Sequence, residues 1–227
     1  MAPSRIQGVI LDVDGTLVDS NDAHAHAWVD AFAEFDFDVP YERVRSLIGM
    51  GGDNLLPEAI GVEKDSPVGE ALAKRRGEIF KERYLKTVNP FRGTRDLLER
   101  MRAEGLEIAI GTSAQEDELK ALLETADVVD LIDTKATSDD AESSKPDPDI
   151  IHAALKRLQL PPAQVLMVGD TPYDIEAAGR AGVRTVAFRS GGWTDAGLNG
   201  AIAVYAGPWD LLDRFDTSPF AAGSGKR

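Results

Sequence analysis

Residues Gly8–Thr16 read GVILDVDGT: an apolar run that ends on a carboxylate, with a second carboxylate two residues later. The run Gly8–Leu11 is short and β-branched, which predicts a buried strand. Asp12 and Asp14 are two positions apart, so in extended chain their side chains project to the same side. Ligands bind at the carboxyl ends of strands in open α/β sheets, and a divalent cation would offset the repulsion between the two carboxylates. The alternative is structural, because Asp14-Gly15 is also a common turn pair.

Three further apolar runs, separated by amphipathic helical patterns, predict a mostly parallel sheet with helices on both faces. The runs are Leu106–Gly111, Val165–Gly169 and Arg184–Phe188. One helix is predicted over Thr94–Glu104 with Thr94 as its N-cap. Another is predicted to open with Asp147 as N-cap and Pro148 as its first residue. The expected fold class is therefore α/β, with a Rossmann-like parallel sheet as its core.

More than ninety residues separate the first two runs, too many for one crossover helix. Aromatic and alanine side chains recur at helical spacing from Trp28 to Phe35, and residues 68–86 predict a long charged helix that breaks near Gly77. We interpret this stretch as an inserted all-helical cap, whose own core contains Trp28. The predicted domains are an α/β core of residues 1–19 and 88–216, a helical cap of residues 20–87, and a disordered tail of residues 217–227.

The composition excludes several classes of protein. Asp and Glu total 39 against 25 Lys and Arg, a formal net charge of -14, so the surface repels nucleic acid and anionic membranes. Without cysteine there is no disulfide framework and no thiolate ligand or nucleophile. No apolar run approaches the ~18 residues of a membrane span, and Val9–Leu11 is too short for a secretory signal. We expect a cytoplasmic protein with no nucleic-acid or membrane partner; no feature of the sequence specifies an oligomeric state.

A second pair of acids follows the run Val165–Gly169. Asp170 comes directly after the run, and Asp174 lies one helical turn further along. Together with the acids of the first run they form an all-oxygen ligand set, for which Mg²⁺ is the best match. The alternative for Asp174 is structural, because Thr171, Pro172 and Asp174 are typical of an N-cap, a first helical residue and a capping-box acid.

Three residues are candidates for binding phosphate. Thr112 and Ser113 follow the second run at the mouth of a predicted helix, whose free N–H groups favour an anion. Ser113 with Glu116 would alternatively form a capping box. Lys145 is a lone base in an acidic stretch, where the alternative is a solvated loop lysine.

The histidines and one glycine-rich segment have less defined roles. His24 and His26 lie about 200° apart around a predicted helix, so they cannot chelate one ion. His24 is a candidate substrate contact, and His152 is interpreted as an ordinary helix residue. Residues Gly49–Gly52 either bring the cap close to the site or break the chain between two cap helices.

Four motifs, in this order, resemble those of the haloacid dehalogenase superfamily of phosphotransferases. They are Asp12–Thr16, Thr112-Ser113, Lys145–Pro148 and Gly169–Asp174. The helical insert after the first motif is similar to the cap of phosphoglycolate phosphatases and β-phosphoglucomutases. The resemblance implies that Asp12 is the nucleophile and Asp14 the general acid and base, with Thr112 and Lys145 on the phosphoryl oxygens. The implied Mg²⁺ ligands are Asp12, the main-chain carbonyl of Asp14 and Asp170, supported by Asp174.

These roles predict hydrolysis of a small phosphorylated metabolite through an aspartyl-phosphate intermediate. Asp14 argues against dehalogenation, because a halide leaves without a proton and dehalogenases of this family generally lack the second aspartate. A β-phosphoglucomutase-like mutase is the alternative: it matches at His24, but the arginine that the resemblance implies for it would fall near Gly52. A catalytically silent binding protein is the third hypothesis, and it would be expected to have lost a catalytic group. A dinucleotide site is excluded, because no G-x-G-x-x-G follows the first strand.

Overall fold

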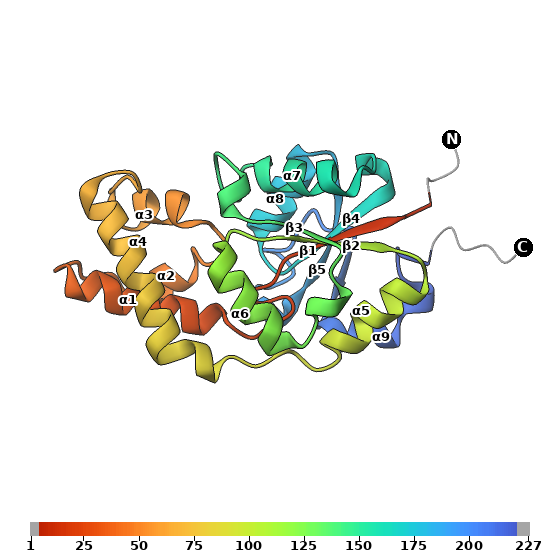
Figure 1. Cartoon of the computed structure of the whole chain (residues 1–227), viewed down its shortest axis with the longest axis horizontal. Helices are drawn as coiled ribbons and strands as arrows, with labels where there is room; N and C mark the ends of the chain where they lie inside the picture. Colours follow the sequence, from red (N-terminus) through yellow and green to blue (C-terminus); the bar gives the residue numbers. More distant parts are fainter. Residues whose placement is uncertain (1–4, 222–227) are drawn as a thin grey trace, which may run out of the picture.

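Six parallel strands form one sheet in the order β3-β2-β1-β4-β5-β6 in the computed structural model, which describes residues 5–221 (Figure 1). The strands are β1 Gly8–Leu11, β2 Glu107–Gly111, β3 Thr134–Ala136, β4 Val165–Gly169, β5 Arg184–Phe188 and β6 Ala203–Tyr205. Strand β1 is central, with Leu11 opposite Ile110 of β2 and Val168 of β4. The predicted fold class is confirmed, and the four expected strands agree with the structure to within one residue.

Helices cover both faces of the sheet (Figure 1). The covering helices are α7 Asp149–Leu158 and α8 Pro172–Arg180 on one face, and α5 Thr94–Ala103, α6 Glu116–Ala126 and α9 Pro208–Asp213 on the other. Alternate residues of β1 pack into the two faces: Ile10 joins the cluster under α7 and α8, whereas Val9 and Leu11 join the cluster on the opposite side. Both faces are therefore apolar, which is why β1 is a continuous apolar run.

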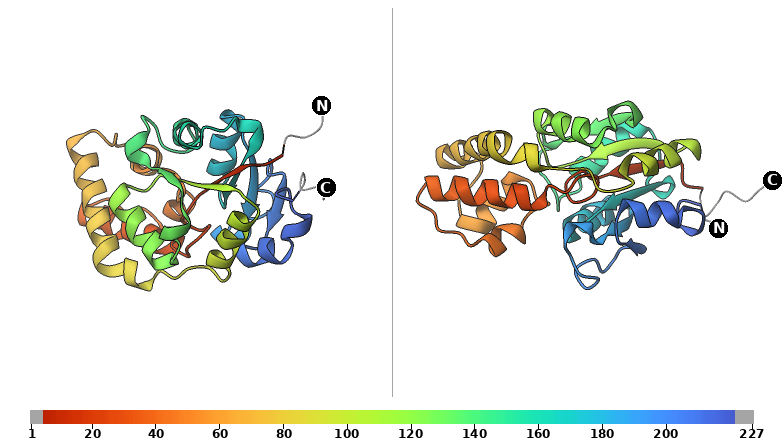
Figure 2. Two further views of the ribbon diagram at one scale, coloured as in Figure 1. Left: turned by 45° about the vertical axis from the view of Figure 1, so that its right-hand side comes forward. Right: turned by 90° about the horizontal axis from the view of Figure 1, so that it is seen from below.

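The remaining large helices lie between β1 and β2 in sequence. They are α1 Asn21–Glu34, α2 Tyr41–Arg45, α3 Gly52–Ile60, α4 Pro67–Ile79, the π-helical turn η1 Phe80–Tyr84 and the 3₁₀ turn η2 Leu85–Thr87. They form a separate lobe to one side of the sheet (Figures 1 and 2). Residues 20–87, the predicted cap, contribute no strand to the sheet. The two chain connections to the lobe run side by side, with the amide of Asp19 donating to the carbonyl of Asn89 at 2.9 Å.

Short 3₁₀ segments complete the secondary structure of the described residues. They are η3 Val129–Leu131, η4 Ser138–Asp140, η5 Pro162–Gln164, η6 Arg189–Gly191 and η7 Phe215–Thr217. No helix within residues 5–221 has the length and apolar character needed to cross a bilayer. Strands β3 and β6 were not predicted, because each has three residues and occupies an edge of the sheet.

Two predicted helix starts are wrong. The N-cap of α5 is Gly93 rather than Thr94, because the Thr94 hydroxyl donates instead to the carbonyl of Leu17 at 2.9 Å. Helix α7 begins at Asp149 with Pro148 as its cap, so Asp147 lies outside the helix. By contrast, the Thr171 and Asp174 capping box of α8 is present as predicted, with Pro172 at the first helical position.

Two predicted interruptions also differ from the structure. Helix α4 continues through Gly77, and the change to π-helical geometry begins only at Phe80. The predicted tail starts too early, because Phe220 is 7% exposed and its ring stacks on Phe215 with centroids 5.8 Å apart. Apolar packing therefore orders residues 217–221. Residues 222–227 of the predicted tail and residues 1–4 of the predicted core lie outside the described part of the chain.

Candidate functional site

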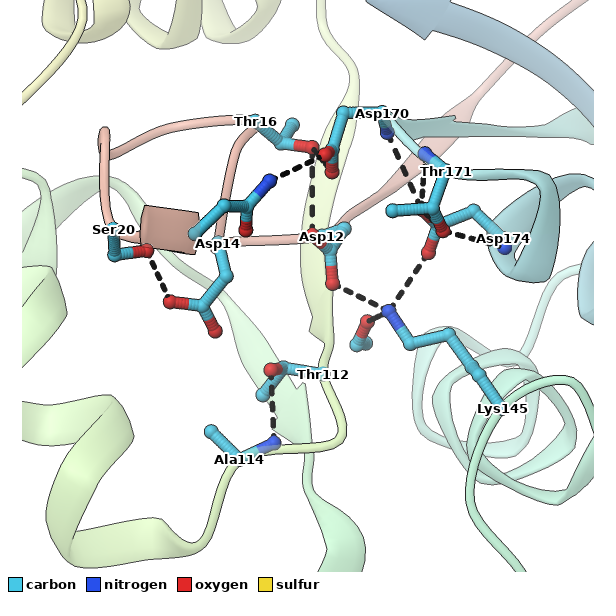
Figure 3. Close-up of polar contacts among 12 residues, drawn as sticks. Asp12, Asp14, Thr16, Ser20, Thr112, Ala114, Lys145, Asp170, Thr171 and Asp174 are labelled. Atoms are coloured by element: carbon cyan, nitrogen blue, oxygen red, sulfur yellow. Dashed lines mark hydrogen bonds and ion pairs between the residues drawn. The ribbon is translucent and has the colours of Figure 1, made fainter. Parts of the chain in front are cut away.

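Three motif residues lie at neighbouring strand ends because the sheet is parallel. Asp12 follows β1, Thr112 follows β2 and Asp170 follows β4. The register that pairs Leu11 with Ile110 and Val168 brings these three ends together, and the amide of Asp12 donates to the carbonyl of Val168 at 2.9 Å. The four sequence motifs therefore gather at the carboxyl edge of the sheet, where the cap lobe meets the core (Figure 3).

An acidic cluster forms the centre of this site. Carboxylate oxygens of Asp12, Asp170 and Asp174 lie within 4.8 Å of one another, and all three residues are buried. Asp170 accepts hydrogen bonds from the Thr16 hydroxyl at 3.0 Å and the Asn21 amide at 2.9 Å. These neutral donors orient Asp170 and bring no positive charge to the cluster.

Asp174 caps helix α8 and also belongs to the acidic cluster, so the structure combines the two alternatives that the sequence left open. Its Oδ2 accepts from the Thr171 hydroxyl at 2.7 Å and from the Thr171 amide at 3.0 Å, which caps α8. Its Oδ1 accepts from the ammonium of Lys145 at 2.8 Å. One carboxylate thus joins the helix cap to the acidic cluster (Figure 3).

Lys145 is the single ammonium that contacts this cluster within the described residues. Its side chain is 1% exposed, which overturns the alternative of a solvated loop lysine. The ammonium donates to Asp12 Oδ1, to Asp174 and, at 3.2 Å, to the carbonyl of Gly111 (Figure 3). Burial alone would lower the pKa of Lys145, but the carboxylates of Asp12 and Asp174 raise it instead. Lys145 therefore holds its charge in the protein interior.

Burial has the opposite effect on the acids. It raises the pKa of Asp12 to about 7, although the Lys145 ammonium acts against this shift. It also raises the pKa of Asp170 well above its usual value, and the charges of Asp12 and Asp174 add to the effect. When all three acids are ionised they carry two more negative charges than Lys145 can balance, since three carboxylates face one ammonium. An oxygen-binding divalent cation fits both the donor atoms and this charge excess.

Asp14 lies outside the acidic cluster and faces the pocket. Its Oδ1 accepts from the Ser20 hydroxyl (Figure 3). The same oxygen lies 2.8 Å from Nε2 of His24. Burial works against ionisation of Asp14, but His24 and Ser20 hold its pKa below the usual value. The side chain is therefore not grouped with the acids that could hold a metal, which leaves only its main-chain carbonyl for that predicted role.

Thr112 and Ser113 both line the same pocket. The Thr112 hydroxyl accepts from the Ala114 amide at 3.1 Å (Figure 3), whereas the buried Ser113 hydroxyl has no hydrogen-bond partner. The predicted capping box of Ser113 with Glu116 is wrong, because α6 begins at Glu116 with Gln115 as its N-cap. Ser113 therefore has a free hydroxyl beside the pocket rather than a capping role.

His24 is buried and joins the cap to the site. Its ring stacks on Phe80 with centroids 4.1 Å apart, and its Nδ1 lies 4.0 Å from a carboxylate oxygen of Glu118. His26 and His152 do not line the pocket; His26 stacks on Tyr41 in the cap lobe. The predicted inability of the two neighbouring histidines to chelate one ion agrees with these separate surroundings.

Two charged pocket residues were missed by the sequence analysis. Arg76 of α4 donates to Glu118 of α6 at 2.7 Å, and its guanidinium lies over the ring of Trp28 at 5.2 Å. The Nε of Arg76 is buried and has no partner. Arg76 is one of several charges on a helix and Glu118 lies far away in sequence, so no local pattern distinguishes either residue. Trp28 packs in the cap, as predicted, and also lines the pocket.

Comparisons with known proteins show which family and which curated proteins this chain is similar to. A model of the family described as haloacid dehalogenase-like hydrolase matches residues 9–188. The chain is 30% identical over 185 residues to a phosphoglycolate phosphatase of Nitrosospira multiformis, covering 79% of this chain and 82% of that protein. It is 31% identical over 210 residues to the phosphoglycolate phosphatase of Escherichia coli K12, covering 82% of each.

Solved structures with a similar fold include a hydrolase and a β-phosphoglucomutase. A hydrolase from Pseudomonas syringae superposes with a TM-score of 0.86 at 31% identity, covering 93% of this chain and 98% of that one. A β-phosphoglucomutase from Clostridium difficile superposes with a TM-score of 0.76, covering 94% and 100%. At 19% identity, the second likeness concerns the fold alone.

The charge excess predicts how metal binding affects stability. The folded, metal-free protein keeps protons on Asp12 and Asp170 at pH values where the unfolded chain has lost them, so its stability falls as pH rises from 3.8 toward about 7. A bound cation must displace these protons, and the competition disappears above that range. Mg²⁺ should therefore raise the melting temperature more at about pH 8 than at about pH 5.5 in calorimetry.

Asp170→Asn is the control, because it removes one candidate ligand and half of the excess charge. It should abolish the Mg²⁺-dependent shift in melting temperature. Equal shifts at both pH values, or a shift that survives Asp170→Asn, would contradict this metal site.

Proposed function

Because the chain belongs to the haloacid dehalogenase-like hydrolase family, we propose that it hydrolyses a small phosphomonoester through a phosphoryl group carried on Asp12. The family and its phosphoglycolate phosphatase relatives make this chain a phosphatase enzyme. The observation that carries the proposed mechanism is the carboxylate of Asp12, which borders the pocket at the end of β1 and accepts a hydrogen bond from the ammonium of Lys145.

In the first proposed step, an oxygen of Asp12 forms a bond to phosphorus and the bond from phosphorus to the leaving oxygen breaks. Asp14 borders the same pocket and is placed to protonate the leaving oxygen. In the second step, water bonds to phosphorus and the Asp12 oxygen leaves, while Asp14 takes the proton from the water. Once Asp14 has given its proton to the leaving oxygen it is in the basic form that this second step requires, and its lowered pKa favours that form.

Positive charge and hydrogen-bond donors surround the position of the phosphoryl group. Lys145, Thr112 and Ser113 line the pocket, and the Ser113 hydroxyl is free to donate. Asp12 and Asp170, together with the main-chain carbonyl of Asp14, would hold Mg²⁺, and Asp174 would steady Lys145. The cation supplies charge that offsets the repulsion between the carboxylate nucleophile and the phosphoryl oxygens.

The far side of the pocket favours a small leaving group with an acceptor such as a carboxylate. Arg76 and Trp28 line it, and the buried Nε of Arg76 lacks a partner while Glu118 occupies another guanidinium nitrogen. A buried donor without a partner is costly, and a substrate acceptor would satisfy it. Together with the activity named for the curated relatives, this supports 2-phosphoglycolate as the first substrate to test.

The two alternatives have less support. A mutase would hold a second phosphate, but the position where the resemblance places its arginine is Gly52, which lines the pocket without a side chain. A silent binding protein has no advantage from a nucleophile, an acid and a lysine that all border one pocket. We propose that the protein acts in the cytoplasm on a small phosphorylated metabolite.

The proposed function predicts phosphate release that depends on both aspartates and on a divalent cation. Wild-type protein with Mg²⁺ should release phosphate from 2-phosphoglycolate, and chelation should stop the reaction reversibly. Asp12→Asn should reduce kcat to the uncatalysed background, and Asp14→Asn should reduce it by about 10²–10⁴-fold, the usual contribution of general acid and base catalysis. A phosphate-release assay over a panel of phosphomonoesters provides the measurement.

Two outcomes would favour the alternatives. Turnover of a sugar monophosphate that requires a bisphosphate activator would indicate a mutase. Wild-type protein no more active than Asp12→Asn on every compound would indicate a binding protein.

The proposed leaving-group contact predicts a substrate-dependent effect at Arg76. Arg76→Met should raise KM for 2-phosphoglycolate by about tenfold or more, since a hydrogen bond to a charged group is lost. KM for a phosphomonoester with an uncharged leaving group should change little. Arg75→Met is the matched control, because Arg75 pairs with Glu34 and does not line the pocket. Equal effects of Arg76→Met on both substrates would remove this residue from the proposed site.

A further inference from the structure

The glycine-rich segment between α2 and α3 presses the cap lobe against two loops of the core. A Cβ on Gly51 would lie 2.2 Å from the side chain of Ser144, which precedes Lys145. A Cβ on Gly49, whose φ is +109°, would lie 2.7 Å from Thr171, the N-cap of α8. Of the two sequence-based interpretations, this close approach is the one that carries consequences for the site. The Thr171 loop contributes Asp170 to the acidic cluster, and the Ser144 loop contributes Lys145, whose ammonium contacts that cluster.

The first two polar side chains of α3 continue this contact. Asp53 Oδ2 accepts from the amide of Ser144 at 2.8 Å. The side-chain amide of Asn54 donates to the carbonyl of Ser144 at 3.0 Å and to the carbonyl of Lys145 at 3.3 Å. Cap side chains therefore hold the main chain of the loop on both sides of the peptide bond that leads into Lys145.

The same loop fixes the ammonium at the nucleophile. Ser144 and Lys145 are 3% and 1% exposed, so the loop packs between the cap and the acidic cluster. From this main chain the Lys145 side chain reaches Asp12, Asp174 and the Gly111 carbonyl. A displacement of the loop would move the ammonium away from Asp12, and hydrogen-bonded charges are sensitive to small displacements.

One detail indicates that Asp53 is not optimised for cap stability alone. Its Oδ1 is buried without a hydrogen-bond partner, while its Oδ2 is bonded to Ser144. A buried unpaired oxygen destabilises the folded state, so an apolar side chain would serve simple packing better. Asp53 also lies in the first turn of α3, where a carboxylate suits the helix dipole, and its bond to the Ser144 amide ties that turn to the Lys145 loop.

We propose that Asp53 and Asn54 are positioning residues, which act through the main chain of Ser144 and Lys145 to place the ammonium on Asp12 when the cap is docked. The inference rests on the proposed function, because it assigns Lys145 to the charge balance of the phosphoryl-accepting carboxylate. It links docking of the cap to completion of the site, so that Asp12 is fully supported only while the pocket is covered.

The sharpest test is Asn54→Asp, which replaces the donating amide by an oxygen of nearly the same size. The new carboxylate would face two carbonyl oxygens and push the loop away. We expect kcat for a phosphomonoester that the wild type hydrolyses to fall by about tenfold or more, with KM changed by less than about threefold. Asp53→Ala should also lower kcat, and Asp53→Asn should recover most of the loss because its amide oxygen still accepts from Ser144.

A second readout follows Lys145 directly and needs no turnover. Full-length protein is treated briefly with acetic anhydride, and acetylation of each lysine is measured by peptide mass spectrometry. Acetylation of buried Lys145, relative to exposed Lys64, should rise about fivefold or more in Asn54→Asp. Glu58→Gln is the control: Glu58 lies on the same helix, pairs with exposed Arg43, and should leave both readouts unchanged.

The outcomes separate the inference from the proposed function. Unchanged kcat and unchanged Lys145 acetylation in Asn54→Asp would overturn the inference. A higher KM with normal kcat and acetylation would also overturn it, because the residues would then only dock the cap. If wild-type protein hydrolyses no phosphomonoester the proposed function fails, while acetylation still tests the placement of Lys145. Asn54→Ala replaces Asn54→Asp if the latter does not fold.

Discussion

The buried ammonium of Lys145, in contact with Asp12 and Asp174, is the interaction on which the site depends. Burial by itself would discharge both partners, lowering the pKa of the lysine and raising that of the acid. The pair offsets part of this cost, because Lys145 keeps its charge and its ammonium lowers the pKa of Asp12 from the value that burial alone would give. The remaining negative charge of Asp170 then suits a divalent cation, so one structural ion pair prepares both the nucleophile and the metal site.

The cap lobe does more than cover the pocket, because its side chains contact residues of the site. Through His24 it contacts Asp14, through Arg76 it contacts Glu118 of the core, and through Asp53 and Asn54 it holds the loop of Lys145. The cap therefore contacts the proposed acid and base Asp14, the side of the pocket proposed to hold the leaving group, and the loop whose Lys145 contacts the proposed nucleophile. Selection of substrate and assembly of the site are therefore properties of the same lobe, and both depend on its docking.

Sequence reasoning predicted the four inner strands of the sheet, and the grouping of the acids that follow them, for a specific physical reason. Parallel strands gather their carboxyl ends, so acids placed directly after β1 and β4 had to meet once the strands were recognised. It could not predict the burial of Lys145, because the flanking acids are typical of solvent and its partner Asp12 is distant in the chain. The pairing of Arg76 with Glu118 was not predicted for the same reason, because the two residues are distant in the chain. Cap-to-core contacts depend on how the lobes dock, which periodicity does not encode.

The most direct test of the central claim is chemical identification of the phosphoryl acceptor. A rapid-quench reaction with 2-phosphoglycolate, or another ester that the protein hydrolyses, is treated with borohydride, which reduces an acyl phosphate to an alcohol, and the peptides are analysed by mass spectrometry. The account predicts homoserine in place of Asp12, and none in Asp12→Asn or before substrate is added. Turnover without reduction at Asp12, or reduction at another acid, would contradict it.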